Sequence, residues 1–340
     1  MEEQIISKYE KMLISKEHKI FIAGHKGMVG NAIKQSLIRK GYLNLLCPSR
    51  EELNLLDFNK VENWFKNNSP DIVILAAAKV GGIYANSNYP VEFLLENLKI
   101  QNNVIENAWK YKVKRFLFLG SSCIYPKLAK QPLKEEYLLN GSLEKTNESY
   151  AIAKIAGIKL CNALRNQYGF DVISLMPTNL YGKGDNYHSR NSHVLPSMIN
   201  RFYEAKIKGT KEVMCWGTGS PKREFLFVDD LADASIFVLE KVSKKNKHLY
   251  DNENNFNGII NVGSGTEISI KELAKLVSSI IGYEGKIIWD SSKPDGTPRK
   301  LLDVSRLNKI GWKSKTTLQK GIEITLKSYI DELKTKKIRF

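Results

Sequence analysis

A short apolar run that ends in a glycine-rich turn most restricts the fold of this 340-residue chain. Residues 19–23 (KIFIA) lead into GHKGMVG, with Gly24, Gly27 and Gly30, and apolar residues then recur at helical spacing. Between a strand and a helix, such glycines permit a tight turn, expose backbone N–H groups to a pyrophosphate, and let the helix pack closely on the strand. The spacing GxxGxxG differs from the GxGxxG of dehydrogenase domains, and a plain glycine turn is the alternative. The context favours a dinucleotide site.

The first half of the chain alternates between strand and helix patterns. Apolar runs bounded by charge at 71–77 (DIVILAA) and 115–119 (RFLFL) are typical of parallel strands buried on both faces. A helix pattern over 93–109 lies between them. Further runs predict strands at 45–47, 173–176 and 224–228. The alternation predicts an α/β fold with a Rossmann-type doubly wound parallel sheet.

Beyond Asn179 the pattern loosens into loops rich in glycine, proline and aromatic residues, which predicts a smaller C-terminal substrate lobe that covers the cofactor. The expected boundaries are an N-terminal extension at 1–18, the Rossmann domain at 19–178 with returns near 223–241 and 257–264, the substrate lobe at 179–333, and a basic, solvated tail at 334–340. In the extension, Ile5, Tyr9, Met12 and Leu13 lie at helical spacing and predict a short amphipathic segment.

Composition excludes several classes of function. The net charge of +16 comes from lysines spread along the whole chain, so we expect anionic small molecules as ligands and no nucleic acid. No apolar run approaches the roughly 20 residues that span a bilayer, so no membrane association is expected. The four cysteines, Cys47, Cys123, Cys161 and Cys215, lack CxxC spacing, so we expect no metal site, no disulfide framework, and a reducing, cytoplasmic location.

The residues after the expected second strand indicate which dinucleotide is bound. An NAD site would carry an acidic residue there for the ribose 2′-hydroxyl. This chain has Ser49 and Arg50 first and then Glu51. Because an arginine suits a 2′-phosphate, NADPH is preferred over NADH. Asp57 either holds the adenine edge or caps the helix that begins with Asn59.

Tyr150 and Lys154 lie one helical turn apart in SYAIAKIAG and predict a catalytic pair. An ammonium on the same helix face favours the phenolate and should lower the pKa of the tyrosine. Such a pair suits proton transfer to a carbonyl oxygen while a hydride arrives at its carbon. In LGSSCIYP, Ser121 follows the 115–119 strand, where its hydroxyl donates to the same oxygen or caps the next turn.

The glycine turn, the strand-end serine and the Tyr150–Lys154 pair resemble an extended short-chain dehydrogenase/reductase acting on nucleotide sugars. Longer strings are similar to a narrower family, the GDP-L-fucose synthases: GHKGMVG, AAAKVGGI, GSSCIYPK, QPLKEEYLL, SYAIAKIAG, MPTNLYG, NSHVLP, REFLFVDD and KPDGTPRKLLDV. The likeness runs from Lys19 to Trp312. Two departures are the N-terminal extension and Lys26, which stands where the family commonly has arginine.

The resemblance implies a bifunctional enzyme that converts GDP-4-keto-6-deoxy-D-mannose to GDP-L-fucose by epimerisation at C3 and C5 and NADPH-dependent reduction at C4. It supplies Cys123 and His193 as base and acid of epimerisation; without it, a buried small thiol and a loop histidine are the plainer interpretations. His188 is the competing histidine, and NSHVLP favours His193. In the reduction, Tyr150 would protonate the oxygen, Lys154 would hold the nicotinamide ribose, and Ser121 would orient the carbonyl.

Pattern and resemblance together give the expected binding residues. Those for NADP(H) are Gly24, His25, Lys26, Gly27, Met28, Val29, Gly30, Arg50, Leu119, Gly120, Ser121, Ser122, Lys154, Pro177, Thr178, Asn179, Leu180 and His193. Those for the GDP-sugar are Arg201, Trp216, Arg223, Asp295 and Lys300, with surface charges and a core tryptophan as the alternative. A homodimer through the helices around 93–110 and 149–168 is also expected. The rival functions are a nucleotide-sugar 4-epimerase with bound NAD and a cofactor-sensing regulator without turnover.

Overall fold

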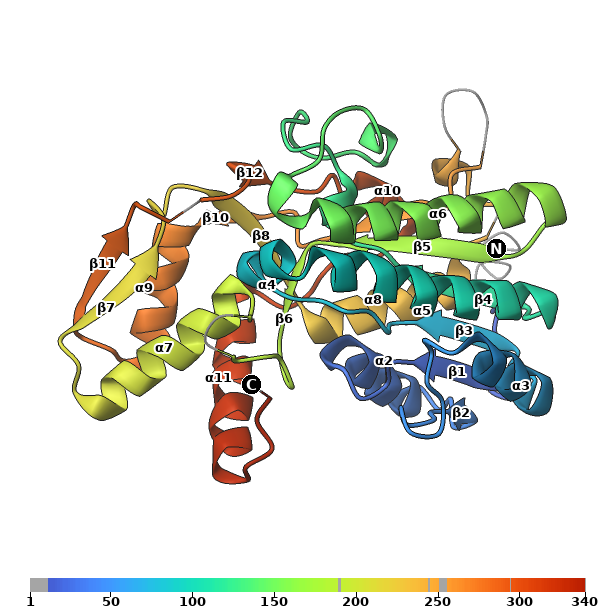
Figure 1. Ribbon diagram of the computed structural model, residues 1–340, viewed down its shortest axis with the longest axis horizontal. Coiled ribbons are helices and arrows are strands. Elements are labelled where there is room, and N and C mark those ends of the chain that lie inside the picture. The colour runs from blue at the N-terminus through green and yellow to red at the C-terminus, as the bar shows by residue number, and fades with distance from the viewer. Residues whose placement is uncertain (1–11, 189–190, 244, 251–255, 294, 340) are drawn as a thin grey trace, which may run out of the picture.

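A six-stranded parallel sheet forms the centre of the computed structural model, which describes residues 12–188, 191–243, 245–250, 256–293 and 295–339 (Figure 1). The strands lie in the order β2-β1-β3-β4-β5-β9, and all neighbours are parallel. Their bounds are Ile20–Ala23 (β1), Leu45–Leu46 (β2), Ile72–Leu75 (β3), Arg115–Leu119 (β4), Val172–Pro177 (β5) and Ile259–Val262 (β9). Since β2 and β3 flank β1 on opposite sides, the carboxyl ends of β1 and β3 form a topological switch point.

Helices cover both faces of this sheet (Figure 1). Ile20 and Ile22 of β1 are buried with residues of α2 and α8, whereas Phe21 is buried with residues of α3, α5 and α6. These helices are Met28–Arg39 (α2), Phe58–Asn68 (α3), Pro90–Lys110 (α5), Glu148–Tyr168 (α6) and Val228–Lys241 (α8). Successive side chains of a strand point to opposite faces, so strands covered on both sides are apolar throughout. The doubly wound α/β fold predicted from the sequence is confirmed.

The C-terminal part of the chain builds a smaller lobe, at the left in Figure 1. Its four-stranded sheet contains β6 (Asn179–Tyr181), β8 (Lys222–Phe227), β10 (Glu267–Ser269) and β12 (Arg299–Lys300), and β8 pairs with the other three. A separate parallel pair consists of β7 (Glu212–Trp216) and β11 (Lys286–Asp290). Three helices pack around these strands: α7 (Val194–Lys208), α9 (Ile270–Ile281) and α11 (Leu318–Lys334). Two further short α-helices are α4 (Ile83–Asn88) and α10 (Ser305–Ile310).

The strand expected at 224–228 forms, but it does not belong to the large sheet, although the sequence pattern predicted that it would. It forms as β8, two residues earlier at its start, and joins the small sheet, because β9 occupies the edge of the large sheet beside β5. The following helix, α8, does pack on the large sheet next to α2. The chain therefore returns to the Rossmann body through a helix and then through β9.

The two ends of the chain also depart from expectation. Met12 and Leu13 lie outside any helix and are 44% and 40% exposed, while Ile5 and Tyr9 lie outside the described residues. In the basic tail, the carbonyl oxygen of Arg339 accepts the backbone N–H of Tyr187 at 2.9 Å, so this part of the tail is attached to the small lobe.

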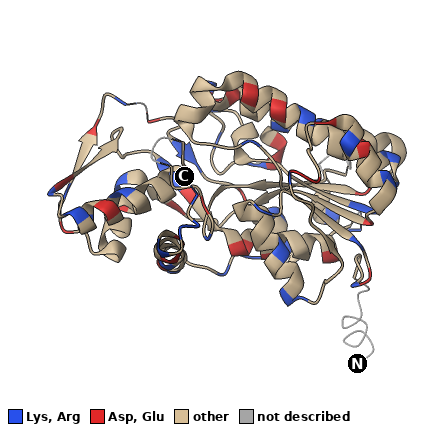
Figure 2. Cartoon of the chain, turned by 60° about the horizontal axis from the view of Figure 1, so that its bottom comes forward, with Lys and Arg blue, Asp and Glu red and all other residues tan. Residues whose placement is uncertain are grey.

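Lysines and arginines are distributed over many elements of both lobes (Figure 2). This agrees with the even spread of lysines along the sequence. No helix within the described part of the chain combines the length and apolar composition needed to cross a membrane.

Candidate active site

The glycine turn joins β1 to α2 at the switch point of the large sheet. Gly24 has a φ of +90°, and a Cβ there would lie 2.7 Å from the backbone nitrogen of Ala77. A Cβ at Gly30 would overlap the carbonyl oxygen of Gly24, and Gly27 is the N-cap of α2, which begins at Met28. Because side chains are excluded here, the backbone N–H groups at the start of α2 are open to an anion. This cradle fits the pyrophosphate of a dinucleotide.

The turn after β2 brings two cations near one carboxylate. Hydrogen bonding, first of all with the Ser49 side chain, lowers the pKa of Glu51, and the charges of Lys26 and Arg50 lower it further. Both Lys26 and Arg50 are exposed. The glycine turn and the turn after β2 thus form a basic edge next to the pyrophosphate cradle, where a 2′-phosphate would be bound.

Asp57 acts as a helix cap. Its carboxylate accepts the backbone N–H of Lys60 at 3.1 Å, and the helix begins at Phe58, one residue earlier than expected. Of the two roles considered for Asp57, the structure therefore supports capping of α3.

Ser121, Tyr150 and Lys154 meet where β4 ends. Tyr150 and Lys154 lie in the first two turns of α6, and Ser121 follows β4 by two residues. The Ser121 side chain hydrogen-bonds with Tyr150 and accepts the backbone N–H of Cys123 at 3.2 Å. The Lys154 ammonium is buried and donates to the carbonyl oxygen of Leu119 at 2.8 Å. The serine thus both caps the next turn and contacts the tyrosine.

The electrostatics of the tyrosine differ from the expectation. Burial raises the pKa of Tyr150, the nearby Cys123 raises it further, and the hydrogen bond with Ser121 opposes both. Burial also lowers the pKa of Lys154 to about 8. The predicted lowering of the Tyr150 pKa by Lys154 is wrong here, because Lys154 Nζ lies 5.9 Å from the tyrosine ring centroid and is bonded to Leu119. Tyr150 is therefore a neutral phenol that can donate a proton.

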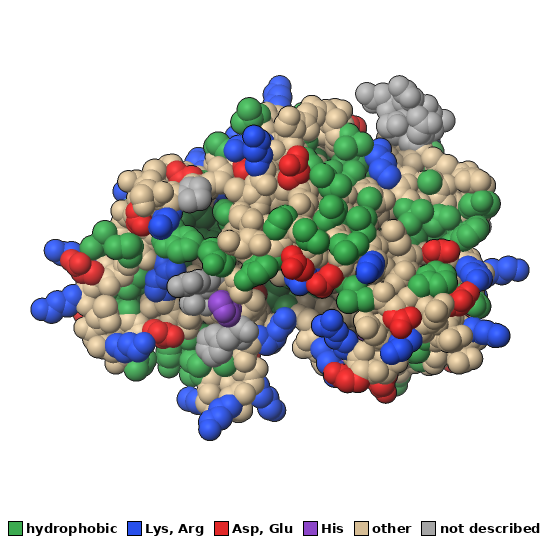
Figure 3. All heavy atoms as spheres, viewed as in Figure 1, with side chains coloured by type: hydrophobic (Ala, Val, Ile, Leu, Met, Phe, Trp, Pro, Cys, Tyr) green, Lys and Arg blue, Asp and Glu red, His purple; other side chains and the backbone are tan. Residues whose placement is uncertain are grey.

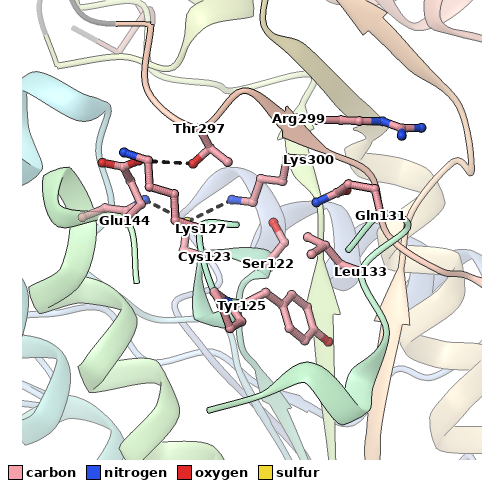
Figure 4. A pocket seen from close by; sticks show the side chains of 12 residues that line it. Ser122, Cys123, Tyr125, Lys127, Gln131, Leu133, Glu144, Thr297, Arg299 and Lys300 are labelled. Atoms are coloured by element: carbon pink, nitrogen blue, oxygen red, sulfur yellow. Dashed lines mark hydrogen bonds and ion pairs between the residues drawn. The ribbon is translucent and has the colours of Figure 1, made fainter. Parts of the chain in front are cut away.

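Two side-chain donors converge on the sulfur of Cys123. Asn147 Nδ2 and Lys300 Nζ each lie 3.3 Å from Cys123 Sγ, and the contact with Lys300 is drawn in Figure 4. A small cavity of about 20 Å³ lies beside these groups, which is room for one water molecule. Sequence reasoning assigned Lys300 to the GDP-sugar and missed Asn147. The available signal was the position of Asn147, one helical turn before Tyr150.

His193 and His188 have different surroundings. His193 is the exposed N-cap residue of α7, yet desolvation by the surrounding protein and the charge of Lys300 lower its pKa. His188 Nδ1 accepts the backbone N–H of Asn191 at 3.2 Å, so this ring stabilises its own loop. Lys300 donates a hydrogen bond to Cys123, and its charge lowers the pKa of His193. These three residues therefore border one site, which agrees with the choice of His193 over His188.

The segment that follows β5 is held by the small lobe. Thr178 Oγ1 and Asn179 Nδ2 both donate to the carbonyl oxygen of Glu224, at 3.2 and 2.7 Å. The backbone N–H of Thr178 donates to Val262 at 3.0 Å. Pro177 to Leu180 therefore cross from the large sheet to the small one at the carboxyl end of β5, where they border the ligand edge of the sheet.

The expected sugar-nucleotide residues divide into two groups. Arg223 donates to the carbonyl oxygen of Asp295 at 3.3 Å; burial lowers its pKa, and the charges of Cys123 and Asp295 oppose this. The Asp295 carboxylate accepts both the backbone N–H and the hydroxyl of Thr218 at 2.8 Å, so it braces the turn after β7.

The second group lies along β7. Arg201 donates to the carbonyl oxygen of Met214 at 2.5 Å, and Trp216 at the end of β7 is 49% exposed. An exposed Trp216 is not the core tryptophan of the alternative interpretation. An accessible indole is able to stack on a base or a sugar.

A doubly wound sheet with a glycine cradle at its switch point and a Ser–Tyr–Lys set beside it defines a dinucleotide-dependent enzyme that acts on a carbonyl or alcohol carbon. The model described as "NAD dependent epimerase/dehydratase family" matches residues 20–263. The chain belongs to this family.

Several individual relatives are similar to this chain over nearly its whole length. The chain is 54% identical to GDP-L-fucose synthase 1 of Arabidopsis thaliana over 315 residues, which cover 93% of this chain and 94% of that one. It is 50% identical to the GDP-L-fucose synthase of Escherichia coli, covering 93% and 97%. Among solved structures, a GDP-mannoheptose C4 reductase from Campylobacter jejuni with NADP bound is 38% identical, has a TM-score of 0.84, and covers 93% of this chain and 99% of that one.

Proposed function

We propose that the protein converts GDP-4-keto-6-deoxy-D-mannose to GDP-L-fucose, as a bifunctional 3,5-epimerase and NADPH-dependent 4-reductase. The observation that carries this proposal is that two catalytic sets border one site: Ser121, Tyr150 and Lys154 on one side, and Cys123 with His193 on the other. A simple reductase needs the first set alone. The relatives named GDP-L-fucose synthase, at 50–54% identity, support the same function.

Epimerisation follows from the chemistry of the substrate ketone. The carbonyl at C4 acidifies the C–H bonds at C3 and C5, because the electron pair left by the proton is delocalised onto the carbonyl oxygen as an enolate. Cys123 accepts the proton on one face, and His193 returns a proton on the other, which inverts the centre. Desolvation and Lys300 lower the His193 pKa, so its protonated form is a comparatively strong acid.

Reduction at C4 uses the other set. The cofactor, when bound, supplies a hydride to C4. Tyr150, kept neutral by burial, gives its proton to the oxygen, and Ser121 hydrogen-bonds to the same oxygen and orients it. The backbone at Gly24–Gly30 would hold the pyrophosphate, Lys26 and Arg50 the 2′-phosphate, and Lys154 the nicotinamide ribose, with Pro177 to Leu180 and His193 bordering the nicotinamide.

The small lobe would bind the GDP moiety. Arg201 and Arg223 would meet the diphosphate and Trp216 would cover the sugar or base. Asp295 would act through the turn that it braces, since its carboxylate is already bonded to Thr218.

We also propose a homodimer in the cytoplasm. α5 and α6 pack against each other on one face of the molecule, and hydrophobic side chains gather over this face (Figures 1 and 3). Val91, Leu95 and Ile152 of these helices are 66%, 46% and 45% exposed. Exposed apolar side chains on two adjacent helices suit a four-helix interface with a second copy.

The test is direct. Purified protein is incubated with GDP-4-keto-6-deoxy-D-mannose and NADPH, and both the loss of NADPH and the stereochemistry of the product are measured. GDP-L-fucose formed with one equivalent of NADPH consumed supports the proposal. Interconversion of a 4-hydroxy nucleotide sugar and its C4 epimer without net NADPH consumption identifies the rival 4-epimerase with bound NAD, and absence of turnover with either substrate supports the regulator.

A further inference from the structure

The sulfur of Cys123 is held by parts of the chain that are far apart in sequence. Asn147 lies 24 residues away and Lys300 lies 177 residues away. Both donate to Sγ at 3.3 Å, inside the range for hydrogen bonds to sulfur. Two donors directed at one sulfur are arranged to stabilise negative charge on it.

Asn147 gives up an ordinary structural role to make its contact. It is the N-cap residue of α6, where an asparagine side chain usually accepts a backbone N–H of the first turn, and here it makes no capping hydrogen bond. Its amide faces Cys123 instead, and its Oδ1 is buried and has no hydrogen-bond partner among the described residues. A buried acceptor without a partner is costly unless a ligand satisfies it.

Lys300 is held rigidly by its neighbours. β12 pairs in parallel with β8, which sets Lys300 opposite Arg223. The next residue, Leu301, receives a hydrogen bond from the backbone of Leu133 and donates to Gln131. The backbone at Lys300 is therefore held in place, and its ammonium contacts the sulfur without a carboxylate partner in the described part of the chain (Figure 4).

The surrounding charges agree with this arrangement. Arg223 is near enough to Cys123 for the sulfur to raise its pKa, while Lys300 lowers the pKa of His193 after the effect of desolvation. Glu144 is bonded to Lys127 at 2.8 Å, so its charge is compensated. The groups that interact with the sulfur are therefore Lys300, Arg223 and the neutral phenol of Tyr150, together with the amide of Asn147.

We propose that Asn147 and Lys300 are positioning residues for epimerisation, which hold Cys123 as an oriented thiolate, and that Asn147 Oδ1 accepts a hydroxyl of the bound hexose. The thiolate takes the proton from C3 or C5, the C–H electron pair becomes the C=C bond of the enolate, and the carbonyl π pair moves to the ketone oxygen. His193 then gives its proton to the opposite face of that carbon, the thiol loses its proton to solvent, and the imidazole regains one from solvent. Lys300 then serves the base and not the diphosphate. The epimerisation step in this proposal rests on the proposed function. The protonation state proposed for the Cys123 sulfur does not depend on it.

The experiment measures the sulfur without any substrate. Purified full-length protein is treated with iodoacetamide over a range of pH, and alkylation of each cysteine is followed by peptide mass spectrometry. Lys300→Met should slow alkylation of Cys123 at pH 7 by about threefold or more and move its pH profile upward, because fewer molecules carry a thiolate. Lys300→Arg should keep most of the rate. Cys47, which is partly buried elsewhere, is the internal control and should not change.

Asn147→Asp separates positioning from folding. Aspartate has the shape of asparagine and its charge is favoured at a helix N-terminus, so the variant should fold, as a melting curve checks. Alkylation of Cys123 should slow because a donor is replaced by a negative charge. Arg299→Met, the neighbouring residue on β12 that pairs with Glu267, is the control for charge loss. Wild-type alkylation in both Lys300→Met and Asn147→Asp, or equal slowing in Arg299→Met, overturns the proposal. If Lys300→Met does not fold, Asn147→Asp decides alone. Slowed alkylation in a protein that makes no GDP-L-fucose refutes only the proposed function.

Discussion

Lys154 Nζ donates a 2.8 Å hydrogen bond to the carbonyl oxygen of Leu119, which ties the catalytic helix α6 to the last residue of β4. Leu119 precedes the Gly120–Ser121 segment, so this hydrogen bond fixes the position of α6, and with it Tyr150, relative to Ser121. The lysine is thus a structural link between α6 and β4, in addition to its proposed role in holding the ribose. Its burial has a measurable thermodynamic consequence.

The first prediction concerns stability and pH. Burial lowers the Lys154 pKa from 10.5 to about 8, so between these values the unfolded chain binds a proton that the folded protein has released. Stability contributed by this site therefore rises with pH across that window, and below pH 8 the full cost of a buried ammonium remains. The free energy of unfolding of wild type relative to Lys154→Met should increase by on the order of 3 kcal/mol from pH 7 to pH 10.5. Urea unfolding at a series of pH values measures this, and the difference between wild type and the exposed-site variant Lys159→Met should not change with pH. A difference between wild type and Lys154→Met that is the same at pH 7 and pH 10.5 would refute the burial argument.

The second prediction concerns cofactor choice. Arg50→Ala removes one charge-assisted contact to a 2′-phosphate, worth about 1.5–3 kcal/mol or roughly ten- to a hundredfold in affinity. The dissociation constant for NADPH should rise by that factor and the constant for NADH should hardly change, as measured by quenching of intrinsic fluorescence. Arg39→Ala, at the far end of α2, is the matched control. Equal effects of Arg50→Ala on both cofactors would remove the arginine from the 2′-phosphate site.

The third prediction separates the two reactions. Tyr150→Phe removes the proton donor and should abolish net reduction, while deuterium uptake at C3 and C5 from deuterated water partly persists. Cys123→Ser replaces the thiol by a far weaker acid and should stop uptake while NADPH still binds. His193→Asn should impair inversion more than NADPH binding. Deuterium uptake is measured by mass spectrometry of the recovered sugar nucleotide. If Cys123→Ser takes up deuterium at the wild-type rate, Cys123 is a packing residue and not the base.

The fourth prediction tests the glycine cradle. A Cβ at Gly30 would overlap the carbonyl oxygen of Gly24, so Gly30→Ala must displace the turn that binds the pyrophosphate. We expect a loss of about 1–3 kcal/mol in the free energy of unfolding, together with loss of NADPH binding. Gly41→Ala is a control for the loss of a glycine near α2, because a Cβ there meets no atom within 4 Å, although its positive φ adds some strain. Retention of NADPH affinity in Gly30→Ala would place the cofactor elsewhere.

The fifth prediction concerns assembly. Light scattering should give the mass of a dimer at micromolar concentration, and Ile152→Glu or Leu95→Glu should give a folded monomer, because a buried carboxylate at an apolar interface is strongly unfavourable. Ile207→Glu changes an equally apolar side chain, 69% exposed on α7, and should leave the dimer intact. A monomeric wild type contradicts the interface on α5 and α6.

Local patterns were sufficient for much of the fold. Arg115–Leu119 forms a strand with the predicted bounds, and Met28–Arg39 follows the glycine turn as a helix. Continuous apolar runs predict parallel strands because both of their faces must be covered, and this depends only on residues adjacent in sequence. The strand at Lys222–Phe227 was recognised, but its sheet was not, because sheet membership depends on partners at Asn179–Tyr181, Glu267–Ser269 and Arg299–Lys300.

Features that arise within one or two turns of chain could be predicted from neighbouring residues: the cradle from Gly24 to Gly30, and Tyr150 with Lys154 on one face of a helix. The charge of these groups, in contrast, depends on the packing of the folded protein. Desolvation raises the Tyr150 pKa and lowers that of Lys154, reversing the effect expected from their spacing, because burial depends on atoms contributed by the whole fold. The tertiary structure also brought Lys300 to Cys123 across 177 residues, a contact that no local pattern records.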